Sequence, residues 1–359
     1  MRQMFIDEAF WADKTVLVTG HTGFKGSWLS LWLNAMGANV VGFARPPVTR
    51  PSLFEATQLS TVVHHVEGDI THAAAVRECF QTHAPEVVFH LAAQALVRPS
   101  YEEPLETLHT NIMGTAHVLD ASLRTPSVTC VVNVTSDKCY EPSLSADGHQ
   151  ESDPMGGHDP YSASKGCAEL VAQAYGRSFY SANGKGLASA RAGNVIGGGD
   201  WSADRLIPDI ISQFQNRQSV YIRSPHAVRP WQHVLESLAG YLVLAQRLHG
   251  DPAAYSSGWN FGPRTEDMRD VQWIVEHMVS LWGEGARWET DAGEHPHENP
   301  CLRLDSSKAI NQLSWAPTLT LVEALHWTTR WYQDFYSTPS RARELCEGQI
   351  QTFMERASV

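Results

Sequence analysis

The chain has 359 residues, of which 43% are hydrophobic and 18% charged, and its formal net charge is −12. This length and composition indicate a globular protein with one large domain or two closely associated ones. A chain this acidic, without a run of Lys and Arg, is not expected to bind nucleic acid. It has no run of about 18 apolar residues, so we expect no membrane span.

The amino-terminal stretch MRQMFIDEAFWADK mixes charged and apolar residues and lacks the apolar centre of a signal peptide. The six cysteines are scattered and form no CxxC pair, which argues against disulfides and zinc. We therefore expect a reducing compartment, the cytoplasm. The segment EHPHE at 294–298 is only a weak indication of a metal ligand set, and we expect no metal site.

Strands and helices alternate over the first 190 residues. We predict strands at 14–20, 39–43, 62–71, 86–93, 129–136 and 186–191, and helices at 24–37, 71–81, 104–124 and 161–180. Gly37 is expected to end the first helix, and Thr71 to cap the second. Apolar strands that alternate with helices predict an α/β fold with a doubly wound, parallel Rossmann sheet covered on both faces.

The pattern changes after Arg191, where glycine and proline become more frequent. Helices are expected near 206–217, 233–249, 268–282 and 320–336. We therefore expect a Rossmann domain over residues 1–190, with segments of about 226–260 added to it. Residues 191–359 would form a smaller substrate-binding region, in which the last 25 or so residues give no signal.

A glycine loop, TGHTGFKG, lies between the first strand and the first helix and places Gly20, Gly23 and Gly26 at GxxGxxG spacing. Glycines there let a pyrophosphate approach the helix N-terminus, whose free N–H groups favour anions. The alternative is a tight turn without a ligand. The position directly after the first strand favours a dinucleotide site.

The adenosine end of such a dinucleotide is less clearly marked. The second strand leads to Arg45 rather than to an acid, and Arg45 could face a 2′-phosphate, stack on adenine or point to solvent, which leaves NAD and NADP both open. Asp69, after the third strand, could accept a hydrogen bond from the adenine amino group or cap a helix. Ala92 and Ala93, at the end of the fourth strand, are small enough for close approach of a cofactor.

Tyr161 and Lys165 lie four residues apart at the start of a predicted helix and therefore on one helical face. A phenol has a pKa near 10, and a nearby ammonium group would lower it. The pair is thus suited to removing a proton from a sugar hydroxyl, although YxxxK also occurs as a plain surface pair. The stretch VTSDKCY adds Ser136, Asp137 and Lys138 at a strand end, where the alternative is a solvated turn.

These motifs, in this order and spacing, resemble those of the extended short-chain dehydrogenases/reductases. The longer stretches TSDKCY, MGGHDPYSASKGCAEL, RAGNVIGGGDW, HAVRPWQHVLE and GWNFGP resemble the nucleotide-sugar 4,6-dehydratases, in the branch that acts on CDP-glucose. The resemblance covers roughly residues 10–330. It implies a non-covalently held NAD, no net redox change, and a role in making 3,6-dideoxyhexoses for the O-antigen of bacterial lipopolysaccharide. It also implies a homodimer formed through a helix bundle, or a homotetramer.

The resemblance also implies roles for individual residues. Tyr161 would take the C4 hydroxyl proton, Ser136 would hydrogen-bond that oxygen, and Lys165 would tune the tyrosine and hold the nicotinamide ribose. Asp137, with a pKa raised by burial, would protonate O6, and Lys138, made neutral by burial and by Lys165, would remove the C5 proton. Related dTDP-glucose and GDP-mannose dehydratases carry a glutamate as this base. The cofactor-binding residues would be Gly20, Thr22, Gly23, Phe24, Lys25, Gly26, Arg45, Asp69, Ile70, Leu91, Ala92, Ala93, Gln94, Asn111, Tyr161 and Lys165.

The nucleoside diphosphate needs local cations in an acidic protein. By resemblance Asn194 and Arg229 contact the diphosphate region, and Arg205 is a further candidate. Many relatives carry an Arg where this chain has Cys301, so His297 or Arg303 would have to compensate.

Three functions stay open from the residues alone. The first is the dehydratase, and the second is another nucleotide-sugar enzyme, such as a dTDP-, GDP- or UDP-sugar dehydratase or an epimerase. The third is a non-catalytic NAD-sensing Rossmann protein, which would have no need for Tyr161, Lys165 or Asp137.

Overall fold

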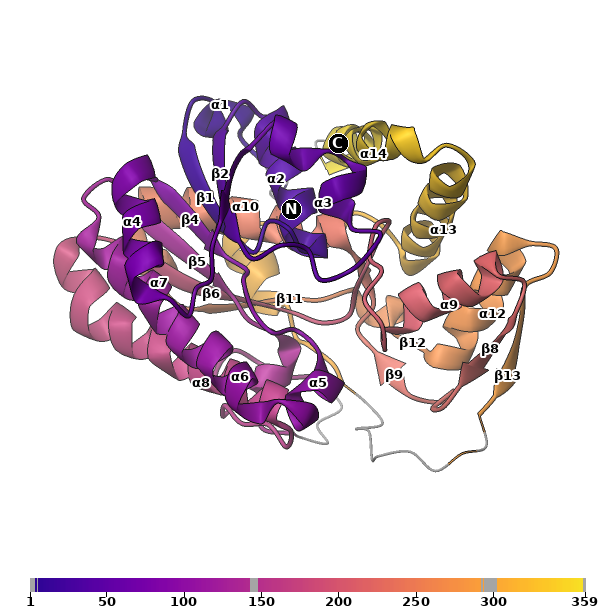
Figure 1. Cartoon of the computed structure of the whole chain (residues 1–359). Coiled ribbons are helices and arrows are strands. Elements are labelled where there is room, and N and C mark those ends of the chain that lie inside the picture. The colour runs from indigo at the N-terminus through magenta and orange to yellow at the C-terminus, as the bar shows by residue number, and fades with distance from the viewer. Residues whose placement is uncertain (1–3, 5, 143–147, 292, 294–301, 358–359) are drawn as a thin grey trace.

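The computed structural model describes residues 4, 6–142, 148–291, 293 and 302–357. At its centre is one parallel sheet in the order β11-β6-β5-β4-β1-β2-β3 (Figure 1). Its strands are β1 (Thr15–Thr19), β2 (Asn39–Ala44), β3 (His64–Glu67), β4 (Val87–His90), β5 (Cys130–Val134), β6 (Gly186–Ala192) and β11 (Gly258–Phe261). The strand order reverses between β1 and β4, where an open α/β sheet binds its ligand. The predicted doubly wound α/β fold is therefore confirmed.

Alternate residues of the strands pack into two cores. Val16 and Val18 of β1 belong to the core shared with α2 (Phe24–Ala35) and α10 (Val234–Gly250). Leu17 faces the other core, under α4 (Ala73–His83), α7 (Gly114–Arg124) and α8 (Pro160–Tyr175). This alternation is what a strand covered on both faces requires.

Most predicted elements are present, but several details differ. The helix expected over 104–124 is α6 (Pro104–Leu108), a π-helical turn (His109–Met113) and α7, and α8 likewise ends in a π-helical turn (Gly176–Tyr180). The strand β11 was not predicted, because its four residues lack a clear period. Thr71 does not cap α4: the N-cap is His72, and the Thr71 N–H and hydroxyl both donate to Asp69 Oδ1, 2.8 Å away. Gly37 does follow α2, with a φ of 80°.

The smaller lobe lies at the carboxyl ends of the strands (Figure 1). It contains α9 (Leu206–Gln215), α12 (Val271–Trp282) and the paired strands β8 (Ser219–Ile222) with β13 (Arg287–Thr290) and β9 (Val228–Arg229) with β12 (Arg269–Asp270). The strands β7 (Val195–Ile196) and β10 (Gln232–His233) form a parallel pair. The short helices are α1 (Glu8–Trp11), α3 (Leu53–Ala56), α5 (Val97–Glu102) and α11 (Pro252–Tyr255).

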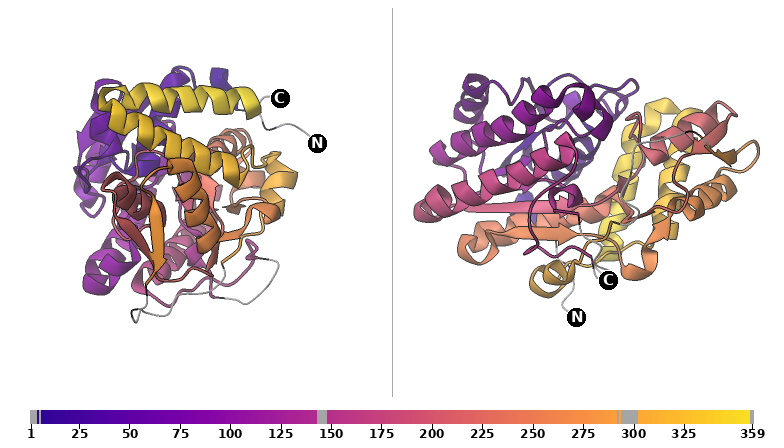
Figure 2. Two further views of the ribbon diagram at one scale, coloured as in Figure 1. Left: turned by 90° about the vertical axis from the view of Figure 1, so that its right-hand side faces the viewer. Right: turned by 90° about the horizontal axis from the view of Figure 1, so that it is seen from below.

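Of the two carboxy-terminal helices, α13 (Leu321–Ser337) packs on α12 and β10, and α14 (Ala342–Ala357) packs on α2 of the sheet domain (Figure 2). The Phe353 ring lies 5.6 Å from the Trp32 ring of α2, and Arg343 donates to the carbonyl of Thr57. The last 25 or so residues, for which the sequence predicted no structure, thus include a helix that covers α2. No helix in the described part of the chain is both long and apolar enough to cross a membrane. Over the same residues no cluster of three or more His, Cys, Asp or Glu could hold a metal ion.

Candidate active site

The glycine loop forms a tight cradle between β1 and α2. Gly20 has a φ of 78°, and a Cβ on it would lie 2.8 Å from the Ala92 backbone. A Cβ on Gly26 would lie 2.2 Å from the Gly20 carbonyl oxygen. Gly23, by contrast, is exposed and is the N-cap of α2, so the helix N-terminus is open to an anion. The loop therefore has the shape that a dinucleotide pyrophosphate needs.

The residues around the loop lie where an adenosine would follow. Thr22 donates to the Arg45 carbonyl, and the Arg45 guanidinium lies 3.7 Å from Asp69 and 3.2 Å from Glu106. Burial alone would raise the pKa of Asp69, but the hydrogen bonds from Thr71 and the Arg45 charge lower it. Two carboxylates beside Arg45 offset its charge, which disfavours a 2′-phosphate.

The segment after β4 is held by Asn111. The Asn111 side-chain oxygen accepts from the Gln94 N–H at 2.8 Å, and its amide donates to the Gln94 carbonyl and to Ser164 Oγ. This geometry suits a residue that shapes the loop under a cofactor. The other predicted contacts in this region are Ile70, which is buried, and Phe24, Leu91, Ala92 and Ala93, which are half-buried. Their cofactor contacts stay predictions.

The acid–base turn, Ser136 to Lys138, leaves the end of β5 as a short 3₁₀ turn. Ser136 is its N-cap, accepting from the Lys138 N–H and donating to Asp137 Oδ1 at 3.0 Å. Asp137 is 3% exposed, and among the described residues its Oδ2 has no hydrogen-bond partner. Burial raises the pKa of Asp137, although the charge of Lys138 and the Ser136 hydrogen bond oppose this. The pKa of Asp137 is therefore shifted in the direction that a general acid requires. Lys138 is half-buried rather than buried, and its role as a base stays a prediction.

Tyr161 and Lys165 lie on the first turns of α8, against the same strand end. Burial raises the pKa of Tyr161 to about 12, and the hydrogen bond with Ser136 lowers it only in part. The expected lowering by Lys165 is therefore wrong for this structure. The Lys165 ammonium faces the Val134 carbonyl at 3.5 Å instead, and burial lowers its own pKa to about 8.

Lys25 belongs to this cluster, which its position in the glycine loop did not reveal. Its amine lies 3.4 Å from the Tyr241 hydroxyl of α10. Burial lowers the pKa of Lys25 to about 7, and the charges of Arg205, Asp137 and Lys165 also act on it. A residue inside such a glycine loop is usually interpreted as a cofactor contact. Only the folded chain shows that this side chain contacts Tyr241 and that the charge of Asp137 acts on it.

Two of the predicted substrate arginines lie close to these groups. Arg205 pairs with Asp200 at 3.3 Å, and its charge favours the charged form of Tyr161. The charge of Arg229 acts on Asp137. Asn194 lies between β6 and β7, where its carbonyl accepts from the Gln232 N–H. His297 and Cys301 lie outside the described residues.

Comparison with known proteins agrees with this arrangement. The sequence model of the NAD dependent epimerase/dehydratase family matches residues 16–258. A CDP-glucose 4,6-dehydratase of Salmonella typhimurium is 54% identical over 91% of this chain and 93% of its own length. A dTDP-D-glucose 4,6-dehydratase of Homo sapiens is 26% identical over 89% of this chain and 90% of its own.

Among solved structures, a dTDP-glucose 4,6-dehydratase of Streptomyces venezuelae with NAD and TYD bound superposes with a TM-score of 0.76. It is 23% identical and covers 91% of this chain and 99% of its own, so it supports the fold. The chain belongs to the NAD-dependent epimerase/dehydratase family.

Proposed function

We propose that the protein catalyses the NAD-dependent dehydration of CDP-D-glucose to CDP-4-keto-6-deoxy-D-glucose. The observation that carries this proposal is the 54% identity, over 91% of the chain, to a CDP-glucose 4,6-dehydratase. The site agrees with it, because a buried carboxyl group, Asp137, lies beside Ser136 and shares its surroundings with Tyr161. A simple dehydrogenase or epimerase has no need for such an acid.

The glycine cradle and the acid pair around Arg45 support NAD as the cofactor. Bound NAD would accept a hydride from C4 and later return it to C6, and its positive nicotinamide would favour a charged phenolate. Gly20, Gly23 and Gly26 would hold the pyrophosphate, and Asp69 would face the adenine. Lys165 would hold the nicotinamide ribose.

Tyr161 and Ser136 would carry out the oxidation half of the reaction. Tyr161 would take the C4 hydroxyl proton, and Ser136 would hold the C4 oxygen by a hydrogen bond. The two side chains already share a hydrogen bond, so they converge on one point. Because the pKa of Tyr161 is raised, cationic groups must stabilise its phenolate when NAD and the sugar are bound. Only then can Tyr161 take the C4 hydroxyl proton.

Asp137 and Lys138 would carry out the elimination. A C4 ketone acidifies the C5 proton, which Lys138 would remove as Asp137 protonates O6 and water leaves. Asp137 can hold this proton because burial raises its pKa. Its Oδ2 lies next to Gly193, since a Cβ added to Gly193 would lie 3.1 Å from this oxygen. Lys138 would return a proton to C5 at the end.

The smaller lobe would bind the nucleotide. We place Asn194, Arg205 and Arg229 at the diphosphate, with His297 as a further contact, and we take residues 191–359 as the substrate-binding region. The sheet domain would comprise 1–190 with about 226–260 added, which is supported by the packing of α10 on the sheet.

We also propose a cytoplasmic homodimer or homotetramer that serves O-antigen synthesis. Support for the dimer comes from large exposed apolar side chains on the α5–α8 side of the sheet: Tyr101, Leu105, Met113, Leu170 and Phe179. Light scattering of the purified protein would give its mass, and a monomer at micromolar concentration would contradict this part of the proposal.

A turnover screen tests the function itself. The protein is incubated with NAD and, separately, the CDP-, dTDP-, UDP- and GDP-activated hexoses, and the products are analysed by mass and NMR. We expect CDP-glucose to be dehydrated fastest. A C4 epimer with an intact C6 hydroxyl would instead identify an epimerase, and cofactor binding without turnover of any sugar would favour the NAD-sensing alternative.

A further inference from the structure

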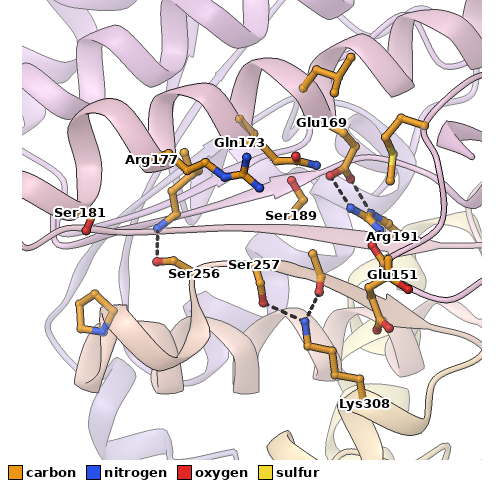
Figure 3. Close-up of a pocket in the computed structure, with 18 of the residues that line it drawn as sticks. Glu151, Glu169, Gln173, Arg177, Ser181, Ser189, Arg191, Ser256, Ser257 and Lys308 are labelled. Carbon is orange, nitrogen blue, oxygen red and sulfur yellow. Dashed lines mark hydrogen bonds and ion pairs between the residues drawn. The ribbon is translucent and has the colours of Figure 1, made fainter.

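A buried polar cluster lies next to the acid–base turn, on residues from the end of β5, from β6 and from α8. It consists of Thr135, Tyr140, Glu169 and Arg191, and we call it the clamp. Glu169 and Arg191 are each 1% exposed. A groove of about 1360 Å³ runs beside α8, and Glu169 and Arg191 are among the residues that line it. Figure 3 shows this pair and its dashed contacts.

The centre of the clamp is a two-point ion pair. Arg191 Nη2 lies 2.8 Å from Glu169 Oε2, and Arg191 Nε donates to Glu169 Oε1 at 2.9 Å. The fold makes room for it, because a Cβ on Gly258 of the neighbouring strand would lie 2.4 Å from the guanidinium. A planar guanidinium that binds a carboxylate through two parallel bonds fixes orientation as well as distance.

The clamp holds the turn at both ends. At the first end, the Thr135 hydroxyl donates to Glu169 Oε1 at 2.5 Å, one residue before Ser136. At the second, Arg191 Nη1 donates to the Tyr140 hydroxyl at 2.7 Å, and that hydroxyl donates to Asn260 Oδ1 at 2.6 Å. The residues between these two anchors are those of the turn.

The clamp also ties the turn to the helix that carries Tyr161 and Lys165. Glu169 follows Lys165 by four residues on α8, so it lies on the same face one turn further along. Gly166, between them, lets the helix approach closely, since a Cβ there would lie 3.2 Å from the Cys139 carbonyl oxygen. One carboxylate therefore joins the strand end, the turn and the helix.

Stability alone does not account for such a cluster. Removing two charges from water costs about as much as their attraction returns, so an apolar pair of similar volume often serves the fold equally well. A geometric requirement of the neighbouring turn accounts for it directly, because groups that exchange protons with one substrate must be held within fractions of an ångström.

We propose that Thr135, Tyr140, Glu169 and Arg191 are positioning residues that fix Asp137 and Lys138 relative to Tyr161, and that elimination depends on them more than C4 oxidation does. This inference rests on the proposed dehydration. Tyr140 lies two residues after Lys138, whereas Tyr161 and Lys165 are held by α8 itself. Loosening the Tyr140 anchor should therefore release the elimination pair first.

Two conservative variants test this without removing a charge. Tyr140→Phe deletes one hydroxyl, and Tyr180→Phe is its matched control, because Tyr180 is also buried but donates to the Leu119 carbonyl of α7 and not to a residue of the clamp. Thr135→Val deletes the other anchor, and Thr135→Ser keeps its hydroxyl. Each variant is mixed with CDP-glucose and NAD, stopped at short times with borodeuteride, which marks every ketone with deuterium, and analysed by mass.

We expect Tyr140→Phe to slow formation of the 6-deoxy product about tenfold or more, while C4 ketone forms at nearly the wild-type rate. The marked sugar that still carries its 6-hydroxyl should therefore accumulate. Thr135→Val should also slow product formation, Thr135→Ser should restore it, and Tyr180→Phe should match the wild type.

Equal slowing of both steps, or accumulation of the same sugar in Tyr180→Phe, would show a general structural effect and overturn the inference. Unchanged product formation in both Tyr140→Phe and Thr135→Val would also overturn it. The wild-type reaction separates this failure from that of the proposed function: if the wild type forms no 6-deoxy sugar, dehydration itself is wrong and the inference falls with it.

Discussion

Asp137→Asn tests two properties of the buried carboxyl group in the acid–base turn. The carboxyl should speed the elimination, and its burial should lower the free energy of unfolding. Asn has almost the same shape as Asp, and its side-chain oxygen can still accept from Ser136, which donates to Asp137 at 3.0 Å. The substitution removes the proton that the account assigns to O6. It also removes the charge from an oxygen that has no hydrogen-bond partner among the described residues.

Two opposite effects follow from this geometry. Loss of a general acid should lower the elimination rate by a factor of about 10² to 10⁴. Because burial raises the pKa of Asp137, the folded protein holds this proton more tightly than the unfolded chain does. The carboxyl then lowers the free energy of unfolding progressively as pH rises above its unfolded pKa. Asn lacks this penalty, so the variant should be more stable at neutral pH, by on the order of 1–3 kcal/mol.

Thermal unfolding and quenched turnover measure the two effects on the same sample. We expect a higher melting temperature at pH 7 than the wild type has, with the difference disappearing in acid, together with retained C4 oxidation and slow elimination. A variant that is less stable at every pH would contradict the predicted cost of the buried carboxyl, and one that eliminates water at the wild-type rate would exclude Asp137 as the acid.

Three further predictions concern neighbouring residues. Lys138→Ala should stop elimination and spare part of the C4 oxidation, as shown by deuterium marking of the ketone; full turnover would remove Lys138 from the mechanism. Burial lowers the pKa of Lys25 to about 7, so the folded protein is penalised most where the amine is charged, at and below that pH. Thermal unfolding should therefore show Lys25→Met to be more stable than the wild type near pH 6, with the gap narrowing as pH rises through 7 and beyond; a gap independent of pH would contradict this. Gly26→Ala should abolish NAD binding measured by calorimetry, since the added Cβ would lie 2.2 Å from the Gly20 carbonyl oxygen, whereas Gly348→Ala, with nothing within 4 Å, should bind NAD normally.

Much of the fold could be predicted because the signals are local. Alternating apolar strands and periodic helices fixed the order of elements up to β6, and the glycine loop marked the switch point between β1 and β4. The strand β11 and the helix α14 could not be predicted. The first is a short strand whose partner, β6, is distant in sequence, and the second is stabilised by packing on α2.

The candidate site, too, could be predicted from local sequence features only in part. The positions of Ser136 and Tyr161 followed from a strand end and a helix start, which are local features. The pKa of Tyr161 did not, because burial outweighs any effect of Lys165, whose ammonium faces the Val134 carbonyl. The contact of Lys25 with the Tyr241 hydroxyl, and the effect of the Asp137 charge on it, also required the tertiary structure.

The most direct test of the central claim is one reaction of the wild-type protein in deuterium oxide. CDP-glucose and catalytic NAD are incubated to completion, and the sugar is examined by NMR. We predict a 4-keto sugar with a methyl group at C6 and deuterium at C5, since C5 loses its proton to the protein and gains a deuteron from the solvent. A sugar with its C6 hydroxyl intact and no deuterium at C5 would contradict it.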